Sequence, residues 1–431
     1  MRLGKLPDNI VWNTGVPQEA CSADATDEFN SGQMIVADGC SYSLDDYSTN
    51  LNNNVLIVGA SGTGKTRKIV TPNIREAIGS YFICDPKGQL YKVWGKYLVD
   101  KGYKIRHIDF IHPDMSDGYN PMDYLKISQD IAKLASGITN SKESEGTRCD
   151  PYWDRMTILL LCAIIGYMKE TNSKEMTFRE ILRLVRLGER EDSDDKSSEL
   201  RKLFDSHKRK HPDSWACEKF EAVDTAPYKT YDCIRSTLAA KFSQFDTEEL
   251  RLMMKKGGFD FTSVAREKTA VFVTVSDTDR TMDTLVNIFF TQAMNELCTY
   301  ADDKCSGGRL PIPVRFILDD FATNCRIDEF PRMISSIRSR ALSVMLMIQS
   351  EAQLRQGYEH DAQTIISNCD TYIYLGGNDV QTAKAVSERC DKPLNEVLYM
   401  PVGHCWVFRR GSQPRYARLA DPDRKDRSID K

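Results

Sequence analysis

The sequence predicts an α/β fold: a mainly parallel sheet with helices on both faces, interrupted by an all-α insertion. Short apolar runs repeatedly end in loops that lead into helical segments, as in a parallel sheet with helical crossovers. Residues 126–257 instead lack strand-like alternation and carry helix signals throughout. At 431 residues the chain is too long for one core of ordinary size. We therefore expect a discontinuous domain of residues 1–125 and 258–431, with residues 126–257 as a second, all-α domain.

The first strand, loop and helix come from residues 55–66. The apolar run 55–58 predicts a strand, and a helix is expected from Lys65 onward. Because Pro72 lies two turns into that helix, the helix is expected to be kinked or short. The next apolar run, 81–84, predicts a second strand that ends in Asp85-Pro86-Lys87-Gly88.

The sheet resumes after the insertion. The apolar run 270–275 predicts a strand, and apolar residues at helical spacing predict a long helix over about 282–297. Three further strands are expected at residues 316–318, 344–348 and 372–375.

The insertion contains two recognisable helices. Thr177 followed by Glu180 forms a capping box that begins one short helix, and Gly188 ends it. The longest apolar stretch of the chain, residues 156–168, is shorter than the roughly 20 residues that span a bilayer. We therefore predict a buried helix there and no transmembrane segment.

Composition excludes some classes of function. The formal net charge is −4 and the pI is near 6.0, so the surface as a whole does not attract nucleic acid, and any such contact needs a local basic patch. The six histidines form no group with zinc-ligand spacing.

The segment Gly59-Ala60-Ser61-Gly62-Thr63-Gly64-Lys65-Thr66 matches a P-loop and stands between a predicted strand and a helix. The glycines let successive backbone N–H groups turn inward around a phosphate, because glycine has no Cβ to block the approach. The predicted nucleotide-binding residues of the loop are Gly59, Ser61, Gly62, Thr63 and Gly64. Lys65 reaches the β and γ phosphate oxygens, and the Thr66 hydroxyl is a ligand of Mg²⁺. The motif predicts a protein that binds and hydrolyses ATP with Mg²⁺.

Two carboxylates follow the strand at residues 316–318. Open α/β sheets place their ligands at the carboxyl ends of strands. Asp319 is therefore predicted to hold Mg²⁺, and Asp320 to orient or deprotonate the attacking water. The competing interpretation is an exposed acidic turn.

Three other polar residues are candidates. Gln349 ends the strand at 344–348 and is predicted to sense the γ-phosphate or hold the attacking water; alternatively, the Gln349-Ser350 pair only begins the next helix. Asp85 ends another strand and is a candidate nucleotide contact. Arg338 lies in a helical segment, where an exposed arginine is usually only solvated.

These motifs, in this order, resemble those of TraG-type coupling proteins of conjugative type IV secretion systems. The resemblance covers most of the chain, and its most specific parts are Asp85-Pro86-Lys87-Gly88 and Gln349-Ser350-Glu351-Ala352-Gln353-Leu354. It implies a RecA-like nucleotide-binding domain with an inserted all-α domain that recognises cargo. It also implies homo-hexameric rings in which Arg338 completes the site of a neighbouring subunit.

The resemblance further implies a function and its partners: an ATP-driven motor at the inner, cytoplasmic face of the cell membrane. It would deliver relaxase-bound single-stranded DNA, or protein substrates, to a secretion channel. Family members usually begin with transmembrane helices, and none is expected here, so either an anchor has been removed or the protein docks on a membrane partner. The second carboxylate is usually Glu, and here it is Asp320, which leaves the hydrolysis rate open. The alternatives are a DNA translocase of the FtsK or HerA kind and a slowly hydrolysing, ATP-binding cargo receptor.

Overall fold

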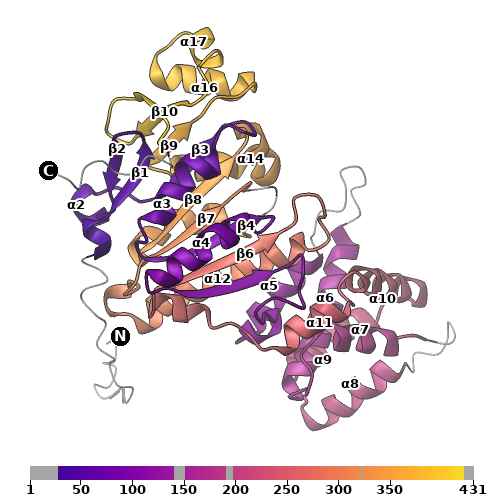
Figure 1. Cartoon of the computed structure of the whole chain (residues 1–431). Helices are drawn as coiled ribbons and strands as arrows, with labels where there is room; N and C mark the ends of the chain where they lie inside the picture. The colour runs from indigo at the N-terminus through magenta and orange to yellow at the C-terminus, as the bar shows by residue number, and fades with distance from the viewer. Residues whose placement is uncertain (1–27, 140–150, 191–197, 322, 324, 422–431) are drawn as a thin grey trace, which may run out of the picture.

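The computed structural model describes residues 28–139, 151–190, 198–321, 323 and 325–421. A large twisted sheet with helices on both of its faces forms one part of the molecule, and a bundle of helices lies beside it (Figure 1). The bundle is made of α5 to α11, which follow the sheet strand β5 in the chain. This arrangement confirms the predicted α/β fold.

Nine strands form the main sheet in the order β11-β10-β9-β3-β8-β7-β4-β6-β5, and two more form a hairpin, β1-β2. The pairs from β9 through β5 are parallel, while β10 is antiparallel to both of its neighbours. The strands are β1 (Gln33–Ala37), β2 (Cys40–Ser43), β3 (Val55–Val58), β4 (Ser80–Pro86), β5 (Lys104–Asp109), β6 (Thr269–Val275), β7 (Val314–Leu318), β8 (Leu342–Ile348), β9 (Thr371–Tyr374), β10 (His404–Arg409) and β11 (Arg415–Arg418).

The helices fall into those of the part that contains the sheet and those of the bundle (Figure 1). The first group is α2 (Asp46–Thr49), α3 (Thr71–Arg75), α4 (Gln89–Asp100), α12 (Asp283–Lys304), α13 (Phe330–Ile334), α14 (Glu351–Tyr358), α15 (Ala362–Ser367), α16 (Val380–Cys390) and α17 (Leu394–Leu398). The bundle contains α5 (Ser128–Thr139), α6 (Pro151–Glu170), α7 (Phe178–Leu187), α8 (Glu199–Lys210), α9 (Trp215–Asp224), α10 (Tyr228–Ser243) and α11 (Glu248–Lys255). Short helical turns are η1 (Lys65–Val70), η2 (Pro121–Tyr124), η3 (Phe261–Ala265), η4 (Ser306–Gly308), η5 (Ile337–Arg340) and η6 (Glu359–Asp361).

The central strands are buried on both faces. Every residue of β3, β6, β7 and β8 is buried, as expected for parallel strands covered by helices. Alternate residues of β3 face opposite cores: Leu56 and Val58 pack toward α12, whereas Val55 and Ile57 pack toward α3 and α4. Fully apolar runs therefore identified these strands in the sequence.

All six predicted strands are present, as β3, β4, β6, β7, β8 and β9. Sequence reasoning missed β1, β2, β5, β10 and β11. For the two edge strands the reason is exposure: β5 is exposed or half-buried over its first four residues, and β11 has no buried residue. An edge strand needs no continuous apolar run, because one of its sides faces solvent.

Most of the predicted helix features are also present. Thr177 caps α7, its hydroxyl accepting a hydrogen bond from the N–H of Glu180, and Gly188 ends that helix. The Glu180 carboxylate accepts hydrogen bonds from Arg183 instead of closing the predicted capping box. The segment around Pro72 is short: η1 leads into α3, which ends at Arg75. The apolar stretch 156–168 lies within α6, and its residues from Leu160 to Ile165 are buried.

The described residues between 126 and 257 form helices and no strand. The exact domain limits at residues 125 and 258 stay a prediction. None of the helices in the described part of the chain combines the length and the hydropathy that a bilayer span needs.

Asp283 begins α12, and burial raises the pKa of its carboxyl to about 6. An unfolded aspartate titrates near 3.9, so the folded protein binds more protons than the unfolded chain between about pH 4 and pH 6. Asp283 therefore lowers the free energy of unfolding as the pH rises through that range. Asp283→Asn is expected to raise this free energy by about 1–2 kcal/mol at pH 8 and by much less at pH 4, where about half of the unfolded carboxyl groups are still protonated. Urea unfolding at both pH values measures the difference, and an equal effect at both would contradict the assignment.

Candidate nucleotide-binding site

The order of the strands brings the predicted site residues to one edge of the sheet. Strands β3, β8, β7 and β4 are consecutive neighbours and run in the same direction. The P-loop follows β3, Gln349 follows β8, Asp319 follows β7, and Asp85 stands near the end of β4. Because neighbouring strands lie about 4.8 Å apart, four segments far apart in the chain meet within about 15 Å.

The P-loop has the backbone that its glycines permit. Gly62 and Gly64 have φ angles of 79° and 93°, a region that other residues rarely adopt. A Cβ built at Gly62 would meet no atom within 4 Å, so the loop leaves open space at that residue. At Gly59 a Cβ would lie 2.8 Å from Thr63 Oγ1 and 2.9 Å from Leu375 Cβ, so this position has no room for a side chain.

Lys65 is buried within the loop. Its Nζ donates to the carbonyl oxygens of Gly59 and Ala60, at 2.6 and 3.2 Å. Burial lowers the pKa of Lys65, and the nearby carboxylates of Asp320 and Asp319 partly oppose this effect. The ammonium group therefore lies close to both acidic residues, as a phosphate-binding cation must.

Thr66 and Asp319 form the contact expected of a Mg²⁺ site. Thr66 Oγ1 donates to Asp319 Oδ2 at 2.7 Å, although 253 residues separate the two in sequence. Burial raises the pKa of Asp319, and the hydrogen bond from Thr66 opposes that rise. A hydroxyl and a carboxylate, both oxygen donors, are the ligand types that Mg²⁺ prefers, so these residues fit the ion.

Asp320 follows β7 and contacts Gln349. Its φ is 47°, in the left-handed region that aspartate and asparagine enter more readily than most residues. Gln349 Nε2 donates to Asp320 Oδ1 at 3.4 Å, while the backbone N–H of Asp320 donates to Asp319 Oδ1 at 3.0 Å. The structure thus places Asp320 and Gln349 together beside the Thr66–Asp319 contact.

Asp85 forms hydrogen bonds with the first turn of a helix and with neither Lys65 nor Thr66. Its carboxylate accepts hydrogen bonds from the N–H groups of Leu90 and Tyr91, at 3.0 and 2.8 Å, in the first turn of α4. Burial raises the pKa of Asp85, and Asp319 adds to that rise. The residue lies near the site and supports the start of α4; a contact with nucleotide stays a prediction.

Ser350 does cap the next helix. Its side chain accepts a hydrogen bond from the N–H of Gln353 at the start of α14. The helix-cap interpretation therefore holds for Ser350, while the side chain of Gln349 faces Asp320.

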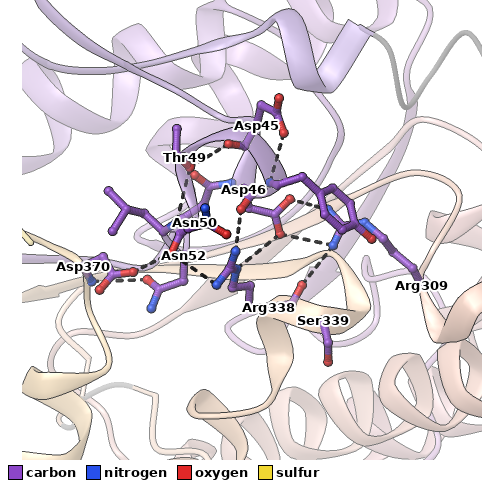
Figure 2. A network of polar contacts seen from close by, with 12 residues as sticks. Asp45, Asp46, Thr49, Asn50, Asn52, Arg309, Arg338, Ser339 and Asp370 are labelled. Carbon is purple, nitrogen blue, oxygen red and sulfur yellow. Dashed lines mark hydrogen bonds and ion pairs between the residues drawn. The ribbon is translucent and has the colours of Figure 1, made fainter.

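Arg338 lies at the opposite end of the parallel strands, where the strands begin. It precedes β8, whose seven residues span about 20 Å and lead to Gln349. Figure 2 shows its guanidinium among Asp46, Asn50 and Arg309. Arg338 Nη2 donates to the carbonyl oxygen of Asp46 at 2.5 Å, and Nη1 donates to that of Asn50 at 3.3 Å. The structure does not bring Arg338 to the P-loop of its own chain.

Two contacts at the site were not predicted from the sequence. The loop after β9 packs on the P-loop: Ala60 N–H donates to the carbonyl oxygen of Gly376 at 3.0 Å. Gln353, one turn into α14, accepts from the N–H of Gln349 at 2.8 Å and donates to Thr323. The glycines at 376 and 377 were the available signal for the first contact, since close backbone approach favours glycine.

Comparisons with known proteins agree with this geometry. A protein-family model described as "Type IV secretory system Conjugative DNA transfer" matches residues 14–393. The type IV secretion system-coupling protein VirD4 of Bartonella henselae (strain Houston 1) is 20% identical over 384 residues, which are 86% of this chain. The match covers 57% of the length of that relative.

Solved structures show the same fold at low identity. The plasmid coupling protein TrwB in complex with the ATP analogue ADPNP is similar with a TM-score of 0.66 and 16% identity, covering 92% of this chain and 91% of the chain in that structure. TrwB in complex with ADP and Mg²⁺ gives a TM-score of 0.64 at 15% identity, over 92% and 91% of the two chains. VirB4 of Thermoanaerobacter pseudethanolicus gives 0.54 at 13% identity, over 91% and 98%. The RecA-like expectation for the sheet domain is therefore supported at the level of the fold.

Proposed function

Because the chain belongs to the type IV secretory system conjugative DNA transfer family, we propose that it is an ATP-hydrolysing coupling motor. It would deliver relaxase-bound single-stranded DNA, or protein substrates, to a type IV secretion channel. The observation that carries the proposal is the 2.7 Å hydrogen bond from Thr66 to Asp319, which joins the P-loop to an acidic pair. A nucleotide triphosphatase needs these two groups together.

The P-loop residues would bind the phosphates. Backbone N–H groups of the loop would surround the phosphates, and Lys65 would exchange its bonds to loop carbonyl oxygens for bonds to phosphate oxygens. Thr66 and Asp319 would hold Mg²⁺, which neutralises charge on the β and γ phosphate oxygens when bound. The structures of TrwB with ADP and Mg²⁺ and with ADPNP support this assignment.

Asp320 would accept the proton of the attacking water. Gln349 Nε2, 3.4 Å from Asp320 Oδ1, would help to orient the carboxylate. General bases of this kind contribute about 10²- to 10⁴-fold to a rate. Aspartate is one methylene shorter than glutamate, so this chain is expected to hydrolyse ATP slowly until DNA or ring assembly tightens the site.

The working form would be a homo-hexameric ring at the inner face of the cell membrane, with Arg338 entering the site of the next subunit. Its position at the opposite end of the parallel strands supports a role in a neighbour rather than in its own site. The partners would be a relaxase, the processed DNA, channel components and a membrane anchor or anchoring protein.

A cargo receptor that binds ATP but does not use its hydrolysis is the second candidate, and the shorter carboxylate of Asp320 favours it. A translocase of the FtsK or HerA kind is less well supported, because the family match and the helical bundle point to coupling proteins.

The variant Asp320→Asn separates the motor from the receptor. Asparagine keeps the size and tolerates the left-handed backbone, but it cannot accept a proton. We expect normal binding of ATP with Mg²⁺ and a loss of roughly 10²-fold or more in single-turnover hydrolysis. DNA transfer in a mating assay should fall as steeply.

The matched control is Asp277→Asn, which removes an exposed carboxylate paired with Lys87 near the end of β6. It should leave both activities unchanged. If Asp320→Asn fails to hydrolyse ATP but still supports full DNA transfer, the protein is a receptor and the motor proposal is wrong.

A further inference from the structure

A long groove separates the helical bundle from the helices on the sheet. Its volume is about 2700 Å³, and its walls come from α5 and α10 on one side and from α12, α13 and α14 on the other. The P-loop does not line it. Figure 1 shows α5 and α12 beside each other where the bundle meets the sheet. Thr323 and Gln353 do line it, so the groove reaches the surroundings of Gln349 but does not include the phosphate loop.

Size and charge restrict what the groove fits. Pockets for small molecules measure about 300–1,000 Å³, so this groove suits a segment of a macromolecule. Seven lysines and arginines and eight aspartates and glutamates line it, together with six asparagines and glutamines. Nucleic-acid sites need an excess of positive charge to replace counterions, and this lining has none. A polypeptide of mixed charge fits the balance.

One wall already binds a loop of this chain. Asn287 Oδ1 of α12 accepts a hydrogen bond from the backbone N–H of Arg326 at 2.6 Å. One turn later, Thr291 Oγ1 accepts from the backbone N–H of Asp328 at 3.2 Å. Side chains four residues apart on the helix thus bind N–H groups two residues apart in the loop.

The spacing of these acceptors along the helix matches the spacing of alternate N–H groups in an extended chain. Four residues of an α-helix rise about 6 Å, and two residues of an extended chain advance about 6.6 Å. Successive acceptors on one helix face can therefore bind alternate N–H groups of an extended chain. The recognition depends on the backbone and not on the side-chain sequence of the bound segment.

The row of polar side chains on α12 that begins with Asn287 and Thr291 continues beyond the loop. Asn295 and Thr299 follow Thr291 at the same spacing and line the groove, while the chain after Asp328 turns away into α13. Neither side chain has a hydrogen bond to another residue in the described ranges. We propose that Asn295 and Thr299 bind the backbone of an extended polypeptide of mixed charge, which lies in this groove along α12.

The segment would be part of a transferred or relaxase-linked protein, so the inference names the cargo class for the coupling role and rests on that role. It assigns protein, and not DNA, to the groove. Binding here requires no nucleotide, so it can be tested separately from ATP hydrolysis.

The test uses the full chain with the double substitution Asn295→Leu and Thr299→Val. Both changes keep the side-chain size and remove the acceptors. The control is Asn395→Leu, an exposed position on α17 outside the groove. The probe is a fluorescein-labelled 16-residue peptide composed of threonine, alanine and equal numbers of lysine and glutamate. A second peptide of the same sequence carries N-methyl groups on alternate backbone nitrogens.

Fluorescence anisotropy should show that wild type and Asn395→Leu bind the first peptide equally. The double variant should bind it roughly tenfold or more weakly, because two hydrogen bonds are lost. The N-methylated peptide should bind wild type with a similar loss, and a 16-nucleotide oligothymidine should not displace the first peptide. The ATP hydrolysis rate should be the same in all three proteins.

Three results would overturn the inference: no peptide binding to wild type, equal binding by the double variant or of the N-methylated peptide, or displacement by oligothymidine. A double variant that only changes the oligomeric state in sedimentation would instead assign the groove to a second copy of the chain. If wild type does not hydrolyse ATP but binds the peptides as expected, the motor proposal is wrong and the inference that the groove binds a polypeptide is unaffected.

Discussion

The Lys65→Ala variant is expected to lose about 10³-fold in ATP hydrolysis, close to the background of the assay. Lys65 is the buried cation of the P-loop and lies beside Asp319 and Asp320. Charge that develops on the phosphates in a partly desolvated site would lose its counter-charge, and such interactions are worth more there than in water. Phosphate release at saturating ATP measures the effect.

Two further variants make the result specific. Lys65→Met keeps most of the side-chain length without the charge and should be as inactive as Lys65→Ala. Lys92→Ala removes an exposed lysine on α4 and should hydrolyse ATP at the wild-type rate. Normal turnover in Lys65→Met would mean that this loop is not the phosphate site.

Arg338→Ala is expected to lower hydrolysis in assembled rings by about 10³-fold, while nucleotide affinity of the isolated subunit is unchanged. Hydrogen bonds within the subunit hold the Arg338 guanidinium in place. Asp46 and Asn50 carbonyl oxygens accept its hydrogen bonds, and Arg309 fixes Asp46 with two bonds of 2.7 and 3.1 Å (Figure 2). The Arg338 side chain remains 38% exposed, so part of its charged edge can contact another subunit.

Mixed rings test whether Arg338 acts in a neighbour. Where a Lys65→Ala subunit supplies Arg338 to an Arg338→Ala subunit that retains Lys65, the site is complete, so the mixture should recover activity that neither variant has alone. Arg410→Ala is the control, because Arg410 lies at the same end of the sheet, donates to Asn50 and pairs with Asp370. Rings that form, as checked by sedimentation, but show no recovery would exclude a role in trans.

The sequence was sufficient where one local signal decided the structure. Apolar runs that end in Gly59, Asp85, Asp319 and Gln349 predicted strands and their polar ends, because parallel central strands are buried on both faces. It was insufficient for β5 and β11, since half-exposed edge strands lack that signal.

The sequence by itself determined the chemistry of this protein: a phosphate loop, an acidic pair and the family to which they belong. Only the tertiary structure decided which residues meet. The strand order places Thr66 beside Asp319 and Gln349 beside Asp320, turns Asp85 toward α4, and leaves Arg338 at the opposite end of the parallel strands. It also creates the groove, where Asn287 and Thr291 bind a loop nearly forty residues away in the chain. Such contacts depend on the order and direction of strands and helices in space, and a linear pattern does not specify that order.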